Sequence, residues 1–137
     1  MSAIFPSPEW VAALVEKINS DEQYQEIAKN WEGDIMYVLE PGGALDETIY
    51  MYIDLWHGKC RSADIVDGIG DYSPAFVISA VFPNLVKVLK GELNPMQAML
   101  TRKLKVQGNM AYMMRNVPVV LDFVRCCQDV TSEVLGE

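Results

Sequence analysis

Few residues of this 137-residue chain combine the type and the spacing that covalent catalysis needs. A hydrolase places a nucleophile beside a base, and a third group orients that base. The chain has one histidine, His57, between two β-rich segments, and it has no Gly-x-Ser-x-Gly motif. A single histidine in a turn is more often solvated than catalytic. We therefore predict no catalytic residues and expect that the protein is not an enzyme.

Acidic residues gather around the sequence DGIGD at 67–71. A glycine-rich loop that binds phosphate leads into a helix N-terminus, whereas this one is followed by Tyr-Ser-Pro and a β-rich run. Asp64, Asp67 and Asp71 could supply oxygen ligands to a cation. Acids around a loop are more commonly just solvated, so we expect neither a metal nor a cofactor.

The three cysteines indicate a reducing compartment. Cys60, Cys126 and Cys127 are an odd set with two adjacent members, which fits neither a disulfide framework nor a zinc-ligand spacing. Arg125 is next to Cys126 in sequence but is expected to point elsewhere around a helix, so neither thiol should be activated. The N-terminus has no signal-peptide pattern, and no apolar run reaches the ~18 to 20 residues that cross a bilayer. We expect a soluble, cytoplasmic protein without a transmembrane segment.

Charge is distributed unevenly along the chain. The net charge is −8, which argues against nucleic-acid binding. The segment from Lys87 to Arg115, however, contains six basic residues and one acid, while the rest of the chain has five basic and eighteen acidic residues. Exposed charge of this kind is commonly just a solvated face. The functional alternative is that four of these residues attract an anionic group of a ligand: Lys87, Lys90, Arg102 and Lys105.

Helix signals open the chain. Ser7 and Pro8 are a typical N-cap and first helical residue, and they predict a helix that ends near Asn19. Ser20 and Gln23 form a capping-box pattern for a second short helix. The β-rich runs that follow predict a hairpin and two further strands, the last of which is apolar on both faces and should lie inside the sheet or be covered on both sides: residues 34–40, 48–56, 60–66 and 75–81.

Three short elements with clear boundaries follow a helix that begins near Pro83 and closes at Gly91. Asn94 precedes a proline at the first helical position, which predicts a short helix. Residues 103–107 alternate between lysine or glutamine and apolar side chains, as a strand with one wet face does. Asn109 then caps another helix.

This region resembles the sterol carrier protein (non-specific lipid-transfer protein) type domain family. The resemblance implies an α+β fold with a five-stranded, mostly antiparallel sheet, helices packed over one face, and an apolar tunnel between them. It also implies binding and transfer of a lipid or fatty acyl ligand without covalent chemistry. Because the sequence has no internal repeat, low-complexity tract or linker, we predict a single domain over residues 1–137. The resemblance depends on these residues: Leu89, Gly91, Leu93-Asn94-Pro95-Met96, Lys103-Leu104-Lys105-Val106 and Gly108-Asn109-Met110.

Methionine is concentrated in the same region, with five of the eight methionines between residues 96 and 114. A stripe of Met and Leu at helical spacing is ordinarily core, but Met also tolerates changes of shape beside it. With the resemblance, we predict that this stripe lines the tunnel and that the four basic residues Lys87, Lys90, Arg102 and Lys105 attract an anionic lipid headgroup near its mouth. The predicted ligand-binding residues are Phe82, Leu85, Leu89, Met96, Met99, Leu100, Met110, Met113, Met114, Val117 and Leu121.

Two alternatives stay open. The first is a lipid-dependent acyl-thioester hydrolase that uses Asp54 or Asp64 as its acid. The second is an accessory or dimerisation module. Pro118 should restart the helix, and apolar residues from Val120 to Val130 then continue on an extended final helix to about Leu135, which could pair with another chain. The sequence does not identify the lipid, and it leaves transient membrane contact and a homodimer open.

Overall fold

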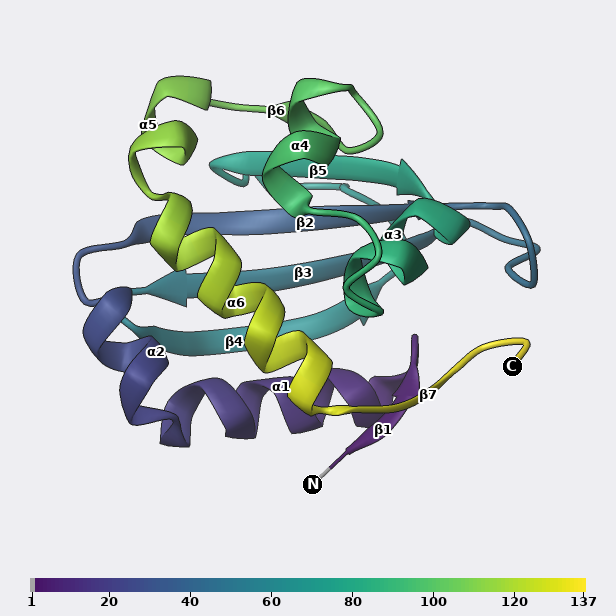
Figure 1. Cartoon of the computed structure of the whole chain (residues 1–137), viewed down its shortest axis with the longest axis horizontal. Coiled ribbons are helices and arrows are strands. Elements are labelled where there is room, and N and C mark those ends of the chain that lie inside the picture. Colours follow the sequence, from purple (N-terminus) through teal and green to yellow (C-terminus); the bar gives the residue numbers. More distant parts are fainter. Residues whose placement is uncertain (1) are drawn as a thin grey trace.

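A computed structural model describes residues 2–137 and shows an α+β fold (Figure 1). Its main sheet has five strands in the order β4-β3-β2-β5-β6. All neighbouring pairs are antiparallel except β2 and β5, which run parallel. The predicted fold class is confirmed. The strands are β2 (Glu32–Glu40), β3 (Ile49–Trp56), β4 (Lys59–Val66), β5 (Phe76–Val81) and β6 (Lys105–Gln107).

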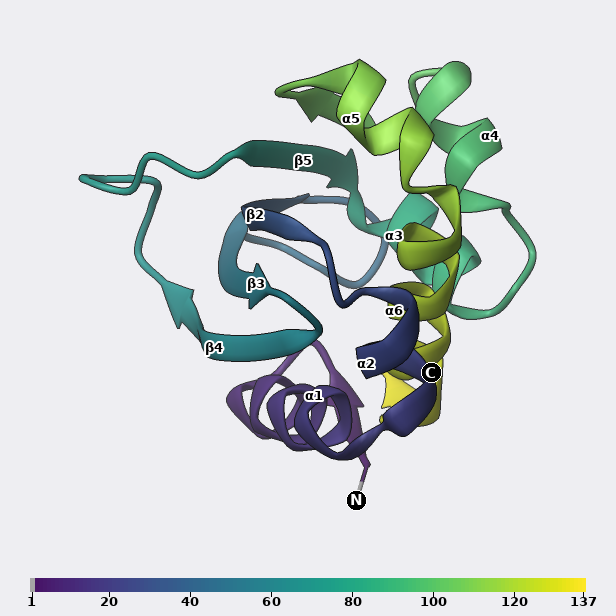
Figure 2. The same cartoon turned by 90° about the vertical axis from the view of Figure 1, so that its left-hand side faces the viewer.

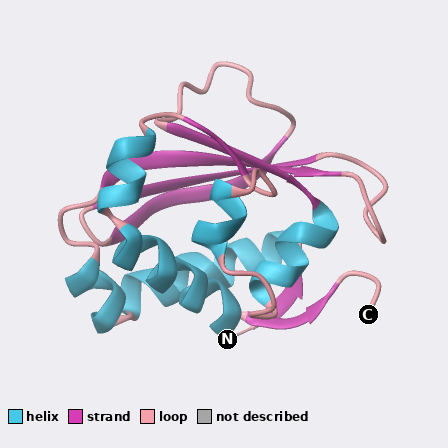
Figure 3. Ribbon diagram, turned by 45° about the horizontal axis from the view of Figure 1, so that its top comes forward, coloured by secondary structure: helices cyan, strands magenta, loops and turns pink. Residues whose placement is uncertain are grey.

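The helices lie on one side of this sheet (Figures 2 and 3). β5 lies inside the sheet, between β2 and β6, as its apolar sequence predicts. Its second face is open, however, and Val81 is exposed there. The helices are α1 (Pro8–Ser20), α2 (Glu22–Ile27), α3 (Phe82–Leu89), α4 (Pro95–Leu100), α5 (Met110–Arg115) and α6 (Val117–Asp129). None of these described helices is long and apolar enough to cross a bilayer.

Side-chain caps start three of the helices as predicted. Ser7 Oγ accepts a hydrogen bond from the Trp10 amide. Asn94 Oδ1 accepts from the amides of the first turn of α4, and Asn109 Oδ1 accepts from the Tyr112 amide of α5. These contacts satisfy amide groups that a helix start otherwise leaves unpaired. Local chemistry therefore explains why two six-residue helices form here.

The predicted cap of α2 is wrong by one residue. Asp21, not Ser20, has the extended backbone of a cap, and its carboxylate accepts from the Tyr24 amide at 2.8 Å. Ser20 is the last residue of α1 and donates its hydroxyl back to the Glu16 carbonyl. A carboxylate is favoured over a hydroxyl at this position because the helix dipole attracts negative charge.

Gly108 separates β6 from α5. Its φ is +135°, and an added Cβ would lie 2.6 Å from the Ala75 carbonyl oxygen and equally close to the Phe76 ring. A side chain cannot fit against backbone at that distance, so glycine is required at this turn. The strand before it is shorter than predicted, with Leu104 buried ahead of β6.

The extended C-terminal helix is not formed. The chain does restart after Asn116, with Pro118 in the first turn, but α6 ends at Asp129. β7 (Thr131–Val134) then pairs in parallel with β1 (Ala3–Phe5). The Thr131 hydroxyl accepts from Trp10 Nε1 at 2.8 Å and donates to a carbonyl at the end of α6, which fixes the change of direction. The apolar face of α6 packs into the core of its own chain.

Candidate functional site

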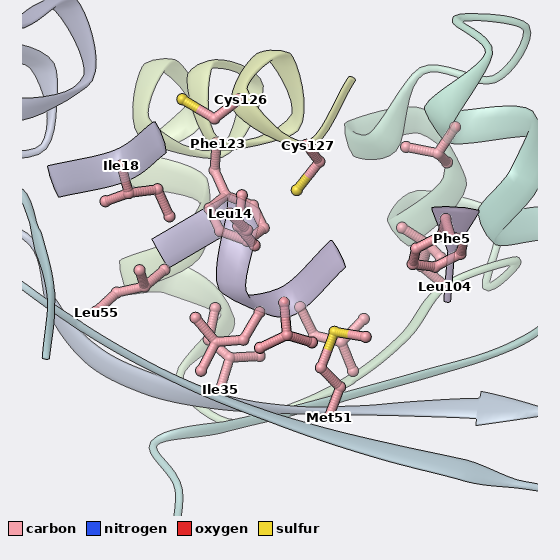
Figure 4. Close-up of a cluster of buried hydrophobic side chains, with 14 of the residues drawn as sticks. Phe5, Leu14, Ile18, Ile35, Met51, Leu55, Leu104, Phe123, Cys126 and Cys127 are labelled. Carbon is pink, nitrogen blue, oxygen red and sulfur yellow. The ribbon is translucent and has the colours of Figure 1, made fainter. Parts of the chain in front are cut away.

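A cavity of about 100 Å³ lies between the inner face of the sheet and the helices (Figure 4). None of its described lining residues has a charged side chain. They come from β1, β2, β3, β5, α1, α3, α4, α5, α6 and two connecting segments: Phe5, Trp10, Trp31, Ile35, Tyr37, Leu39, Met51, Ile53, Leu55, Ile78, Leu85, Val88, Leu89, Pro95, Met99, Leu104, Met113, Val119, Val120, Phe123, Val124 and Cys127.

The sheet supplies the cavity floor by simple alternation. Ile35, Tyr37 and Leu39 are two residues apart on β2 and therefore share one face. The register places Tyr37 opposite Met51 on β3 and beside Ile78 on β5. Tyr37 thus lies on a central strand of the floor, with an apolar neighbour on each side.

α6 supplies most of the opposite wall. Val120, Phe123, Val124 and Cys127 have the i, i+3, i+4, i+7 spacing of one helix face. Phe123 and Cys127 project from α6 toward the side where the sheet residues lie (Figure 4). The Phe123 ring stacks on Tyr37 with centroids 6.1 Å apart and planes 5° from parallel.

Four of the predicted ligand-binding residues line the cavity: Leu85, Leu89, Met99 and Met113. Phe82 and Met96 are buried in the core outside the lining, and Met110 and Val117 are half-buried. The remaining three are on the outer surface, with exposures of 68% for Leu100, 40% for Met114 and 41% for Leu121.

The misplacements have a geometric cause. The predicted stripe is wider than the face that each helix turns inward. On α5 only Met113 is buried, and Met114, about 100° further round the helix, is exposed. On α6, which restarts after Asn116, Val120 lines the cavity while the adjacent Leu121 is exposed. The sheet residues of the lining are absent from the prediction because it locates the strands without choosing the face that the helices cover. The alternation of apolar and polar side chains along each strand could have identified the face that the helices cover.

The polar groups of the lining are satisfied except at Tyr37 and the weakly polar Cys127 thiol. Trp10 Nε1 donates to Thr131 Oγ1 at 2.8 Å, and Trp31 Nε1 donates to the Gly33 carbonyl at 2.9 Å. The Tyr37 hydroxyl has no hydrogen-bond partner among residues 2–137. Burial raises the pKa values of Tyr37 and Cys127 well above their usual ranges, so both groups stay protonated and neutral.

The four predicted headgroup residues lie outside the cavity. Lys87, Lys90, Arg102 and Lys105 are all absent from its lining, and Arg102 and Lys105 are exposed. Lys90 Nζ is 2.6 Å from Glu137 Oε2. The structure therefore separates the basic residues from the apolar lining.

Arg125 is the centre of an ion-pair cluster behind α6. Its guanidinium contacts Asp21 at 2.7 Å, Asp122 at 2.8 Å and Asp129 at 3.2 Å. Asp21, Asp122 and Cys126 lie close enough together to suggest metal ligands, but Arg125 and Lys17, which is 3.0 Å from Asp21, already supply counter-charges to the two carboxylates. The expectation that Arg125 points away from Cys126 is wrong, because Nη2 lies 3.8 Å from Sγ. Burial outweighs this cation and raises the pKa of Cys126 to about 12, so the thiol is not activated.

The residues considered for catalysis are dispersed. His57 is exposed, and its Nε2 is 2.6 Å from Glu32 Oε2. Asp54 accepts two hydrogen bonds from Arg61, and Asp64 is exposed. None of these three side chains lines the cavity.

The fold is shared with solved structures. The crystal structure of a sterol carrier protein 2 is 28% identical, with a TM-score of 0.82 over 91% of this chain and 98% of that chain. The solution structure of a conserved hypothetical protein from Thermus thermophilus is also 28% identical, with a TM-score of 0.84 over 96% and 94%.

A more distant solved structure shares only its fold with this chain. Part of the stereoselective inverting sec-alkylsulfatase Pisa1 from Pseudomonas sp. is 12% identical, with a TM-score of 0.56 over 82% of this chain and 16% of that chain. A search of curated proteins found no match. The family model of the SCP-2 sterol transfer family, however, matches residues 12–120, and the chain therefore belongs to that family.

Proposed function

We propose that the protein binds the apolar part of a lipid in the cavity between the sheet and α3 to α6, and carries it without covalent chemistry. Family membership indicates lipid binding or transfer in general. The observation that supports this specific site is the cavity itself, whose described lining comes from both the sheet and the helices and includes no charged side chain. Such a lining favours alkyl or ring carbons over any polar substrate.

The volume of the cavity bears on how a lipid enters. At ~24 cal/mol per Å³, keeping about 100 Å³ empty costs only about 2 kcal/mol, less than a domain's net stability of about 5 to 15 kcal/mol. An empty pocket of ~300 Å³, the low end for a drug-sized ligand, would cost about 7 kcal/mol. The protein can therefore hold this small cavity without a ligand, and a whole lipid requires the helical wall to move outward.

A carrier role is supported by the position of the nucleophilic and acidic side chains relative to the cavity. No described cavity residue provides a nucleophile beside a base, and burial keeps the Cys127 thiol protonated. The acids considered for a thioester hydrolase are outside the cavity, and Asp54 is engaged by Arg61. Purified protein should therefore return an acyl-CoA probe unhydrolysed.

Two adjacent residues of α6 provide a direct test of the binding site. Val120→Phe adds volume inside the cavity, whereas Leu121→Phe adds it on the exposed side of the same helix. We expect Val120→Phe to weaken binding of cis-parinaryl alcohol, followed by its fluorescence, by about tenfold, a loss of ~1.4 kcal/mol within the usual cost of overpacking. Leu121→Phe should change it less than twofold. Equal effects of the two variants, or no binding by the unmodified protein, would contradict the proposed site.

We also propose that an anionic headgroup stays outside, near the exposed basic residues. Arg102 and Lys105 have no ion pairs among residues 2–137, so both are available to an anion. The cavity gives a carboxylate no cation in exchange for its hydration. Organic extraction of the purified protein, followed by mass spectrometry, identifies the class of lipid that it retains.

A further inference from the structure

We infer that the Tyr37 hydroxyl is the polar recognition point of the cavity, and that it binds a neutral oxygen of the ligand, a hydroxyl or a carbonyl, in preference to a carboxylate. The inference rests on the proposed function, because it requires a ligand in the cavity. It identifies a ligand class: a long apolar molecule with one uncharged oxygen along or at the end of it.

The first support is the position of Tyr37. Its side chain lies on the inner face of β2, with Met51 opposite and Ile78 beside it on the neighbouring strands. The Phe123 ring stacks on it from α6. These neighbours hold the phenol ring between the floor and the helical wall, so its hydroxyl has a fixed place in an otherwise apolar site.

The second support is that Tyr37 is a strong donor without a partner. Both indole N–H groups of the lining, on Trp10 and Trp31, already donate to protein oxygens. Tyr37 makes no such bond within residues 2–137, and the thiol of Cys127 is at best a weak acceptor. The Tyr37 side chain lines the cavity and is half-buried, so its unpaired hydroxyl is free to bond to a ligand oxygen.

The third support is electrostatic and excludes a carboxylate from this point. No described lining residue is cationic, and the lysines and arginines of the basic segment are outside the cavity. Arg125 is the basic residue of α6, and three aspartates engage it. A carboxylate beside Tyr37 would lose its hydration without gaining a counter-charge, whereas a hydroxyl or carbonyl oxygen needs only one donor.

Tyr24 provides a matched control. Its hydroxyl is fully buried without a partner, whereas Tyr37 is half-buried, and Cys127 is a neighbour of both tyrosines. Tyr24 does not line the cavity, however, so a ligand there should not reach it. The variants Tyr37→Phe and Tyr24→Phe each remove a single oxygen and keep the ring.

The test compares 1-hexadecanol with heptadecane, which has a methyl group in place of the hydroxyl, and with hexadecanoate at pH 8. Binding of each ligand is measured directly by titration calorimetry, because cis-parinaryl alcohol has the same hydroxyl and would itself lose affinity in Tyr37→Phe. We expect Tyr37→Phe to weaken hexadecanol binding about five- to tenfold, as the loss of one buried hydrogen bond predicts, and to change heptadecane and hexadecanoate less than twofold. Tyr24→Phe should change none of the three more than twofold.

The outcomes separate this inference from the proposed function. If the unmodified protein binds none of the three chains, the proposed function fails. If it binds them and Tyr37→Phe changes hexadecanol and heptadecane equally, only the inference is overturned. If hexadecanoate loses as much affinity as hexadecanol, the preference for a neutral oxygen is wrong.

A second measurement does not depend on the variants binding ligand or folding equally well. With ¹³C at Cζ of the tyrosines in the unmodified protein, one resonance should shift on addition of hexadecanol and stay in place with heptadecane. The Tyr37→Phe spectrum assigns it by its absence. A shift of equal size with both ligands, or a shift confined to other tyrosines, would contradict the role of Tyr37.

Discussion

The two ends of α6 are held by different interactions. At its C-terminal end, Arg125 connects Asp21, Asp122 and Asp129, and Trp10 fixes the turn into β7 through Thr131. At its N-terminal end, the helix breaks at Asn116 and continues into α5, whose buried residue is Met113. One end is fixed by charge and hydrogen bonds, and the other mainly by apolar and aromatic packing: Met113 and Val119 are buried, and Tyr112 packs against Trp31 and Phe76 and accepts a hydrogen bond from the Glu32 amide. The wall of the cavity should therefore open at α5 and the start of α6.

The largest effect is expected at the fixed end. Arg125→Met leaves the nearly buried carboxylate of Asp122 without a cation, while Asp21 keeps Lys17 at 3.0 Å, so the free energy of unfolding should fall by about 3 kcal/mol, the low end for a broken buried pair. Urea denaturation at pH 7 measures this. Lys29→Met, which breaks an exposed pair with Glu26, is the control and should cost about 0.5 kcal/mol or less. Similar losses in both variants would show that the cluster does not fix this end.

A substitution at the movable end, which comprises α5 and the start of α6, should lower the free energy of unfolding less, and its effect should be confined to nearby residues. Met113→Ala removes the side chain that α5 buries beside the cavity, and we expect a loss of about 2 kcal/mol, the low end for a buried methionine, because the wall there adjoins open space. Hydrogen exchange should accelerate in residues 110–121 and stay unchanged near Arg125. Met114→Ala, one residue away and exposed, should stay within about 0.5 kcal/mol. Accelerated exchange throughout α6 would contradict a local opening.

Acid should loosen the fixed end and not the movable one. The hydrogen bond from Arg125 holds the pKa of Asp21 well below its usual range. Because the folded pKa is depressed, this stabilisation is fully present above pH ~4 and is lost as the pH falls toward the folded pKa. Urea midpoints should therefore fall between pH 5 and pH 2 in the unmodified protein, and fall less in Arg125→Met, which has already lost the pair. A parallel fall in both would exclude Asp21 as the cause.

This contrast also explains what could be predicted from sequence. The short helices α4 and α5 are specified by local chemistry, and their caps at Asn94 and Asn109 were predicted correctly, as was the cap of α1 at Ser7. The β1–β7 pair and the Arg125 cluster depend on residues about a hundred positions apart, which no local period encodes. Which methionines face the cavity was predicted only in part, because α4 and α5 each turn only part of the predicted apolar stripe toward it.

The smallest expected effect is on ligand binding, from reversing exposed basic charges near the movable end. The basic segment from Lys87 to Arg115 spans the helices that should open, while acids gather around Arg125 at the fixed end. The double variant Arg102→Glu and Lys105→Glu changes two exposed side chains, so its unfolding free energy should stay within about 0.5 kcal/mol. Hexadecanoate binding should weaken about threefold at low salt, since such surface attraction is screened within ~10 Å at 0.1 M salt, and hexadecanol binding should not change. Equal losses for both ligands would mean that these residues contact the chain and not its headgroup, and the separation between an apolar interior and a basic outer rim would then be wrong.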